Sequence, residues 1–246
     1  MRRFSWLALL VFAGCGHAEP VANPAVAELK KLPPGIHKLT AEVPGVGVVN
    51  YTIEVPETYD GKTPVPLILA LHYGYEGAKP APYTGAVLLR VLGPGLGSLK
   101  AIVIAPDVVD GDWTDTKNET AAVWLTKAVI KTYAIDPKRI VITGFSMGGE
   151  GTWFIGSRHQ DLFTGAIPIA APVAASDATW KIPVYVIHSD ADETVSYEGA
   201  NEHANDIKKK GATLEFRTAK GLTHQDTGAY ADTLPDALKW LQSKWK

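Results

Sequence analysis

Apolar runs alternate with stretches of helical periodicity along this 246-residue chain, and this alternation limits the folds that it can adopt. Five of the seven strand candidates are apolar without interruption, as strands are when helices cover both faces of a parallel sheet. We therefore expect an α/β fold with a mostly parallel sheet and helices on both faces. The strand candidates are residues 46–55, 65–74, 101–109, 140–146, 165–172, 183–190 and 213–220, and the clearest helical patterns are residues 120–133, 198–210 and 232–245.

The first residues have the pattern of an export signal. Two arginines precede an apolar run, residues 4–13, which is long enough for the core of a signal peptide and too short to span a bilayer. The four residues FAGC, which end in Cys15, resemble a bacterial lipobox, whose cysteine becomes the lipidated first residue of the mature protein. The alternative is an ordinary secretory signal with a chance cysteine.

These patterns predict a signal peptide over residues 1–14, a lipidated tether over residues 15–34 and one domain over residues 35–246. We expect an exported lipoprotein, either periplasmic or associated with the outer membrane or cell surface. The lipid anchor would be its only contact with a membrane.

Composition argues against several other classes of protein. Lysine and arginine total 24 against 26 acidic residues, without the basic patch that nucleic-acid binding requires. Cys15 is the single cysteine, so the chain has no internal disulfide or multi-cysteine metal site, and it contains no H-E-x-x-H motif. We expect no metal, no other cofactor and no nucleic-acid partner. The oligomeric state is left open.

The segment Gly144-Phe145-Ser146-Met147-Gly148 is a G-x-S-x-G motif directly between a strand candidate and a helical stretch. In this context the motif holds the serine on a tight turn, and the glycines avoid collisions that a Cβ would cause. A serine hydroxyl becomes an effective nucleophile when a histidine, oriented by a carboxylate, takes its proton. The motif therefore predicts Ser146 as a catalytic nucleophile.

The base and the acid are expected in loops that follow later strands. Of the seven histidines, His224 alone follows the last strand candidate, whereas His72 and His188 end strands and are expected to fix loops. Asp190 and Asp192 both lie at the end of the strand candidate 183–190 and are rival acids. Because the carboxyl ends of parallel strands meet at one edge of a sheet, these side chains should converge there.

Three segments resemble the α/β-hydrolase superfamily, in its branch of esterases, polyhydroxyalkanoate-depolymerase-like enzymes and predicted peptidases. The first is PLILALHYGY, whose turn resembles the H-G turn that supplies a backbone amide to the oxyanion hole. The second is DPKRIVITGFSMGGEGTW, which surrounds the nucleophile. The third is IHSDADETV, which is similar to the family pattern H-G-x-x-D-x-x-V that carries the acid. The resemblance implies Asp192 as the acid and His224 as the base. Tyr73 and Ser189 stand where the family often has glycine.

The tetrahedral intermediate of acyl transfer needs two backbone N–H groups to stabilise its oxyanion. Met147, directly after the nucleophile, should supply one of them. The resemblance implies Gly74 for the other, with Tyr73 next. Tyr73, at the end of the strand candidate 65–74, and Trp113, in the loop after the candidate 101–109, are also expected to line the substrate site.

The expected function is hydrolysis of carboxylic esters through an acyl-enzyme intermediate. Only ten residues separate the strand candidates 165–172 and 183–190, so we expect no lid domain and an open crevice that takes small esters or the ends of polymers. Two alternatives remain: a serine peptidase that uses the same triad, and an inactive membrane-tethered binding module.

Overall fold

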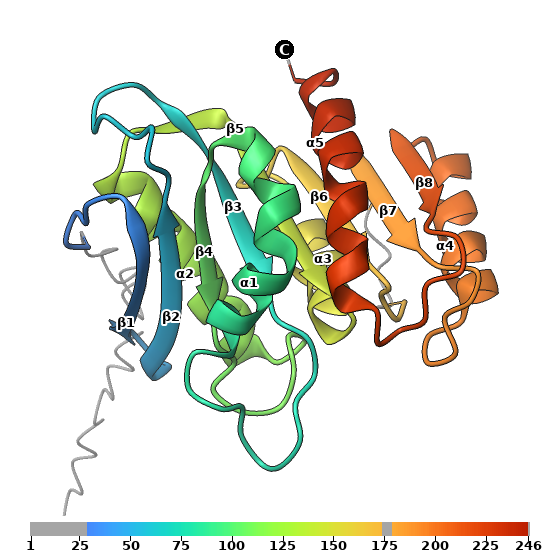
Figure 1. The fold of residues 1–246 in the computed structure, drawn as a ribbon, viewed down its shortest axis with the longest axis horizontal. Helices are drawn as coiled ribbons and strands as arrows, with labels where there is room; N and C mark the ends of the chain where they lie inside the picture. The colour runs from blue at the N-terminus through green and yellow to red at the C-terminus, as the bar shows by residue number, and fades with distance from the viewer. Residues whose placement is uncertain (1–28, 174–178, 246) are drawn as a thin grey trace, which may run out of the picture.

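The computed structural model describes residues 29–173 and 179–245 and contains one sheet between two layers of helices (Figure 1). The strands are β1 (Gly35–Val43), β2 (Gly47–Val55), β3 (Val65–Leu71), β4 (Ile102–Pro106), β5 (Ile135–Phe145), β6 (Gly165–Ile169), β7 (Val184–His188) and β8 (Leu214–Thr218). Their order in the sheet is β1-β2-β4-β3-β5-β6-β7-β8, and β2 alone runs opposite to the other seven strands. The predicted α/β fold with a mostly parallel sheet is confirmed.

Helices cover both faces of the sheet, as predicted (Figure 1). They are α1 (Thr84–Leu96), α2 (Thr116–Thr132), α3 (Met147–Arg158), α4 (Tyr197–Lys209) and α5 (Leu234–Gln242), with two 3₁₀ turns, η1 (Gly97–Leu99) and η2 (Thr227–Thr233). One apolar cluster lies between the sheet and α2, α3 and α4, and a second lies between the sheet and α1 and α5. Because both faces are covered, β3, β4, β6 and β7 are buried along almost their whole length.

Two elements were absent from the sequence prediction, each for a physical reason. β1 alternates exposed residues with half-buried or buried ones, because at the edge of the sheet only one of its faces packs against the core. α1 contains Gly93-Pro94-Gly95, a combination that normally ends a helix. The missing side chain of Gly95 is required by packing, since a Cβ there would lie 2.2 Å from the Ala231 carbonyl oxygen.

β5 begins five residues earlier than predicted and includes Pro137. The proline is accommodated because the pairing of β5 with β3 shifts register between Ile135 and Ile140, and prolines within sheets are found at such irregularities. Beyond this point β5 is regular and leads directly into the turn that carries Ser146.

The predicted signal peptide, Cys15 and most of the predicted tether lie outside the described residues. Among the helices of residues 29–173 and 179–245, none is long and apolar enough to cross a bilayer. The same residues contain no inserted domain between β6 and β7.

Candidate active site

Ser146 occupies a strained turn between β5 and α3. Its backbone has φ 55° and ψ −119°, a conformation that costs a non-glycine residue about 1 to 3 kcal/mol. The two motif glycines are required by close packing: a Cβ on Gly144 would lie 2.2 Å from the Gly148 carbonyl oxygen, and one on Gly148 would lie 2.0 Å from the Leu71 carbonyl oxygen. The turn is held further by a hydrogen bond of 2.9 Å from the Ser146 N–H to the Ile169 carbonyl. This geometry is that expected from the G-x-S-x-G context.

The structure brings Ser146, His224 and Asp192 into one hydrogen-bonded row. The Nε2 of His224 lies 2.9 Å from the Ser146 Oγ, and its Nδ1 lies 2.8 Å from an Asp192 carboxylate oxygen. Both the imidazole and the carboxylate are almost fully buried. The ring of Phe145 packs against the His224 ring with 5.1 Å between centroids. These distances join three residues that are far apart in the sequence.

The carboxylate of Asp192 is held by its own loop. One oxygen accepts hydrogen bonds from the backbone N–H groups of Thr194 (2.9 Å) and Val195 (2.8 Å), which leaves the other for His224. Burial alone raises the pKa of Asp192, but the hydrogen bonds from His224 and from these two N–H groups outweigh burial and lower the pKa below its ordinary value. Asp192 is therefore ionised at neutral pH, as the orienting residue of a triad must be.

Asp190, the rival acid, has a different position. Its carboxylate is exposed and accepts a hydrogen bond of 2.9 Å from the Gly221 N–H, so it ties the end of β7 to the loop that carries His224. The structure thus places Asp192, and not Asp190, against the imidazole.

A second histidine, His188, lies close to the same Asp192 oxygen that contacts His224. Its fully buried ring has Nε2 at 3.1 Å from the Val195 carbonyl oxygen and at 3.5 Å from an Asp192 carboxylate oxygen. Burial lowers the pKa of His188, so the ring stays neutral and leaves the negative charge of Asp192 to His224. The sequence shows that His188 ends a strand but not that it contacts the acid, since this contact depends on how the loop folds back.

The two predicted oxyanion donors come from adjacent segments. Met147 is the first residue of α3, where backbone N–H groups have no partner within the helix. The start of α3 presses against the end of β3, because Gly148 has no side chain to separate them. The Tyr73 carbonyl accepts a hydrogen bond from His72 Nδ1, and in a trans peptide the following N–H, that of Gly74, points the opposite way. The Gly74 N–H is therefore directed away from the buried imidazole.

The prediction that Trp113 lines the substrate site is wrong. Its side chain is only 1% exposed, and its indole N–H donates a hydrogen bond of 2.9 Å to the His72 carbonyl. The position after β4 suggested an exposed residue of the crevice, but the ring packs inward beneath the turn that contains Gly74. Tyr73 itself is half-buried and packs on the second apolar cluster.

His72 connects this turn to the loop after β4. Its Nδ1 donates to the Tyr73 carbonyl at 2.7 Å, so its Nε2 is the acceptor for the Val108 N–H at 3.2 Å. Both contacts require a neutral ring with the proton on Nδ1. Burial lowers the pKa of His72 to about 4, which keeps the ring neutral at physiological pH.

This pKa predicts a measurable effect on stability. In the unfolded chain His72 is protonated below about pH 6.5, whereas in the folded chain it is protonated only below about pH 4. Because the unfolded state binds the extra proton between these values, acidification lowers the free energy of unfolding. Between pH 7 and pH 4.5, urea titrations should show the wild type losing about 2 kcal/mol more than His72→Asn, which cannot gain the proton. Equal losses in the two proteins would contradict a neutral, buried imidazole.

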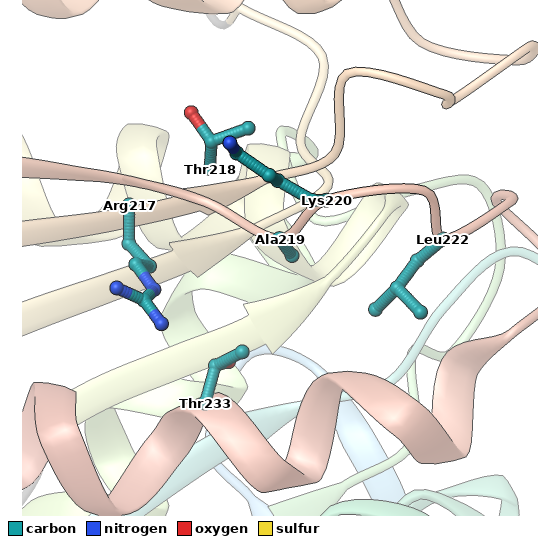
Figure 2. Close-up of a pocket in the computed structure, with 6 residues that line it drawn as sticks. All are labelled: Arg217, Thr218, Ala219, Lys220, Leu222 and Thr233. Atoms are coloured by element: carbon teal, nitrogen blue, oxygen red, sulfur yellow. The ribbon is translucent and has the colours of Figure 1, made fainter.

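One pocket of about 340 Å³ lies near the triad but does not contain it (Figure 2). It is lined by Arg217, Thr218, Ala219, Lys220, Leu222 and Thr233. Figure 2 shows the side chains of Arg217 and Leu222 pointing from segment 217–222 toward the helical turn that carries Thr233. In residues 29–173 and 179–245, no group of three His, Cys, Asp or Glu side chains is arranged to hold a metal ion.

Comparisons with known proteins agree with this architecture. A crystal structure of a thermostable esterase has a TM-score of 0.71 and 24% identity, covering 85% of this chain and 62% of that one. The fluorophosphonate-binding serine hydrolase F of Staphylococcus aureus has a TM-score of 0.68 and 15% identity, covering 85% of this chain and 98% of that one. At these identities the likeness establishes the fold.

The curated relatives have low sequence identity to this chain, and the match covers only part of each relative. A probable feruloyl esterase C of Aspergillus niger is 26% identical over 202 residues, which cover 78% of this chain and 66% of that protein. An acyl-protein thioesterase 1 homolog of Dictyostelium discoideum is 26% identical over 107 residues, 41% of this chain and 47% of that protein. In both relatives the match spans less than two thirds of the full length.

A family model defines the relationship more firmly than these pairwise matches. The model described as the dienelactone hydrolase family matches residues 80–233, which is more than half of the chain and includes Ser146, Asp192 and His224. The α/β fold, the strained serine turn and the match of this model lead to one conclusion: the chain belongs to the dienelactone hydrolase family.

Proposed function

We propose that the protein is a serine hydrolase that cleaves carboxylic esters through an acyl-enzyme intermediate. The observation that carries this proposal is the row of hydrogen bonds from Ser146 Oγ through His224 to Asp192, at 2.9 and 2.8 Å. Family membership and the esterases among the similar proteins support it.

In the first half of the reaction, Ser146 Oγ attacks the ester carbonyl carbon while His224 Nε2 takes the hydroxyl proton. The N–H groups of Met147 and Gly74 would donate to the oxyanion of the tetrahedral intermediate, each contributing about 3 to 4 kcal/mol. The intermediate collapses, the bond to the alcohol oxygen breaks, and the imidazolium gives its proton to the departing alkoxide. Asp192 holds the tautomer of His224 throughout and stabilises the imidazolium.

In the second half, water replaces the alcohol. His224 takes a proton from the water as its oxygen attacks the acyl carbon, and the proton returns to Ser146 Oγ when the carboxylic acid leaves. The described residues place no domain over this edge of the sheet, which suits small esters and the accessible ends of polymers.

A fluorophosphonate probe tests the proposal directly, because it phosphonylates only serines that are activated in this way. We expect the native protein to be labelled stoichiometrically, with the adduct on Ser146 by peptide mass spectrometry, and Ser146→Ala to remain unlabelled. Comparison of ester and peptide substrates then separates the esterase from a peptidase that uses the same triad. A folded wild type that is never labelled would point instead to an inactive binding module.

The position of the enzyme in the cell is a separate proposal. We infer from the lipobox-like sequence that Cys15 is acylated and tethers the enzyme to a membrane. In a bacterial host, metabolic labelling with a palmitate analogue should mark the wild type, and Cys15→Ala should remain unlabelled. Labelling of both proteins, or of neither, would contradict the anchor.

A further inference from the structure

An apolar pocket of about 290 Å³ lies beside the triad, where β6 and β7 end. One wall consists of residues 171–173, which follow β6, and the other consists of residues 194–196, from the loop after Asp192. Gly199 and Ala200 of α4 complete the lining. The pocket is therefore distinct from the triad itself, whose three residues do not line it.

One wall touches the helix that follows Ser146, and the other is hydrogen-bonded directly to Asp192. Gly149, in the first turn of α3, touches the first wall so closely that a Cβ there would lie 2.6 Å from the Cβ of Ala171. The second wall is attached to the acid, since the N–H groups of Thr194 and Val195 donate to the Asp192 carboxylate. The pocket therefore lies at the same edge of the sheet as Ser146 and His224.

The first wall leaves the sheet through a strained residue. Ala170 is fully buried with φ 46°, in the left-handed region that alanine seldom occupies. Its N–H donates a hydrogen bond of 2.8 Å to the Ile187 carbonyl, which holds this conformation. A strained backbone conformation of this kind persists only where the surrounding structure holds it in place. Here the conformation of Ala170 turns the chain so that residues 171–173 lie along the pocket.

The lining suits an uncharged, apolar group. It contains alanine, proline, valine and glycine, and Val173 leaves 40% of its surface exposed to solvent. Of the two hydroxyl groups, that of Ser196 already accepts a hydrogen bond from the Gly199 N–H. A volume of about 290 Å³ lies just below the range for whole ligand sites, which is roughly 300 to 1,000 Å³. Such a space matches one aromatic ring or a short alkyl chain better than a long lipid chain.

We propose that this pocket is a specificity subsite that binds an aryl or short alkyl substituent of the ester during hydrolysis. The inference rests on the proposed esterase function and adds the class of substrate to it. The substituent belongs either to the acyl part or to the alcohol part of the ester, and the two sources are separable by experiment.

Gly199→Val tests the subsite by filling it. A Cβ at Gly199 meets only atoms of Ser196, at 3.5 and 3.6 Å, which is ordinary contact, so the first turn of α4 has room for the branch point of the valine. We expect kcat/KM for a benzoyl or butanoyl ester to fall at least about 10-fold relative to the acetyl ester with the same leaving group, if the acyl part occupies the pocket. If the alcohol part occupies it, the loss appears instead between benzyl acetate and methyl acetate.

Two further variants distinguish a filled pocket from a general effect of substitution. Gly97→Val adds the same side chain at a remote glycine with helical φ −59° and nothing within 4 Å, and it should leave both substrate ratios unchanged. Val173→Ser removes apolar surface at an exposed position, so it cannot unfold the core, and it should raise KM for the bulky ester selectively.

The outcomes separate the subsite from the proposed function. If the wild type hydrolyses esters and is labelled by the fluorophosphonate, but neither Gly199→Val nor Val173→Ser changes a substrate ratio, the subsite is refuted and the esterase stands. If the folded wild type is neither labelled nor active on any ester, both proposals fail together.

Discussion

His224→Ala should lower kcat for ester hydrolysis by about 10⁶-fold, the scale seen when the base of such a triad is removed. The imidazole connects the Ser146 hydroxyl to the buried charge of Asp192 through contacts of 2.9 and 2.8 Å, so its removal leaves the hydroxyl without this route for its proton. Turnover of a 4-nitrophenyl ester measures the loss.

The effects of removing Ser146 and His224 should not add, and this test is specific to a catalytic role. Ser146→Ala combined with His224→Ala should be no slower than either single variant, because the two residues act as a unit. His37→Ala is the matched control, since His37 lies outside the site and its ring bonds the Pro33 carbonyl at 2.8 Å. If His224→Ala kept activity within 10-fold of the wild type, another residue would have to be the base.

Asp192→Asn should lower kcat by about 10⁴-fold while leaving the protein folded. The amide oxygen of asparagine can still accept from the Thr194 and Val195 N–H groups, but its NH₂ group would face His224 Nδ1 and favour the wrong tautomer. Steady-state kinetics together with an unchanged circular dichroism spectrum would establish the effect.

The chain provides its own control for this variant. Asp190→Asn changes a carboxylate two residues away that bonds the Gly221 N–H in an exposed position. It should keep kcat within a few-fold of the wild type. Equal losses in Asp190→Asn and Asp192→Asn would mean that both act on the loop structure and that neither orients the base.

The elements that could be predicted from the sequence are those whose residue patterns are local. A continuously apolar strand followed by G-x-S-x-G marks the nucleophile turn, and the alternation of strands and helices predicts a parallel sheet whose carboxyl ends bring Ser146, Asp192 and His224 to one edge. The geometry agrees with that placement, with contacts of 2.9 and 2.8 Å along the row. Residue patterns alone left Asp190 and Asp192 as rivals, the family resemblance favoured Asp192, and the fold of one short loop places Asp192 against the imidazole.

The features that could not be predicted depend on packing between distant segments. Trp113 lies in a polar loop, and nothing local indicates that its indole would be buried against the carbonyl of His72. His188 contacts Asp192 only because the acid loop folds back over the end of β7. The pocket wall that follows Ala170 could not be predicted either, because the strained backbone of Ala170 is held by its hydrogen bond to the Ile187 carbonyl on a neighbouring strand.

The close approach of Gly95 to Ala231 has a consequence for engineering this protein. η2, which contains Ala231, begins three residues after His224, so α1 packs against the segment that positions the proposed base without contributing any reactive group. An added methyl at Gly95 would push this support away, and a shift of 1 Å in a reacting group can cost about 100-fold in rate. Directed evolution libraries confined to residues near Ser146 would not sample this position. Stabilisation designs that replace helical glycines with alanine would include Gly95, and this replacement should lower activity.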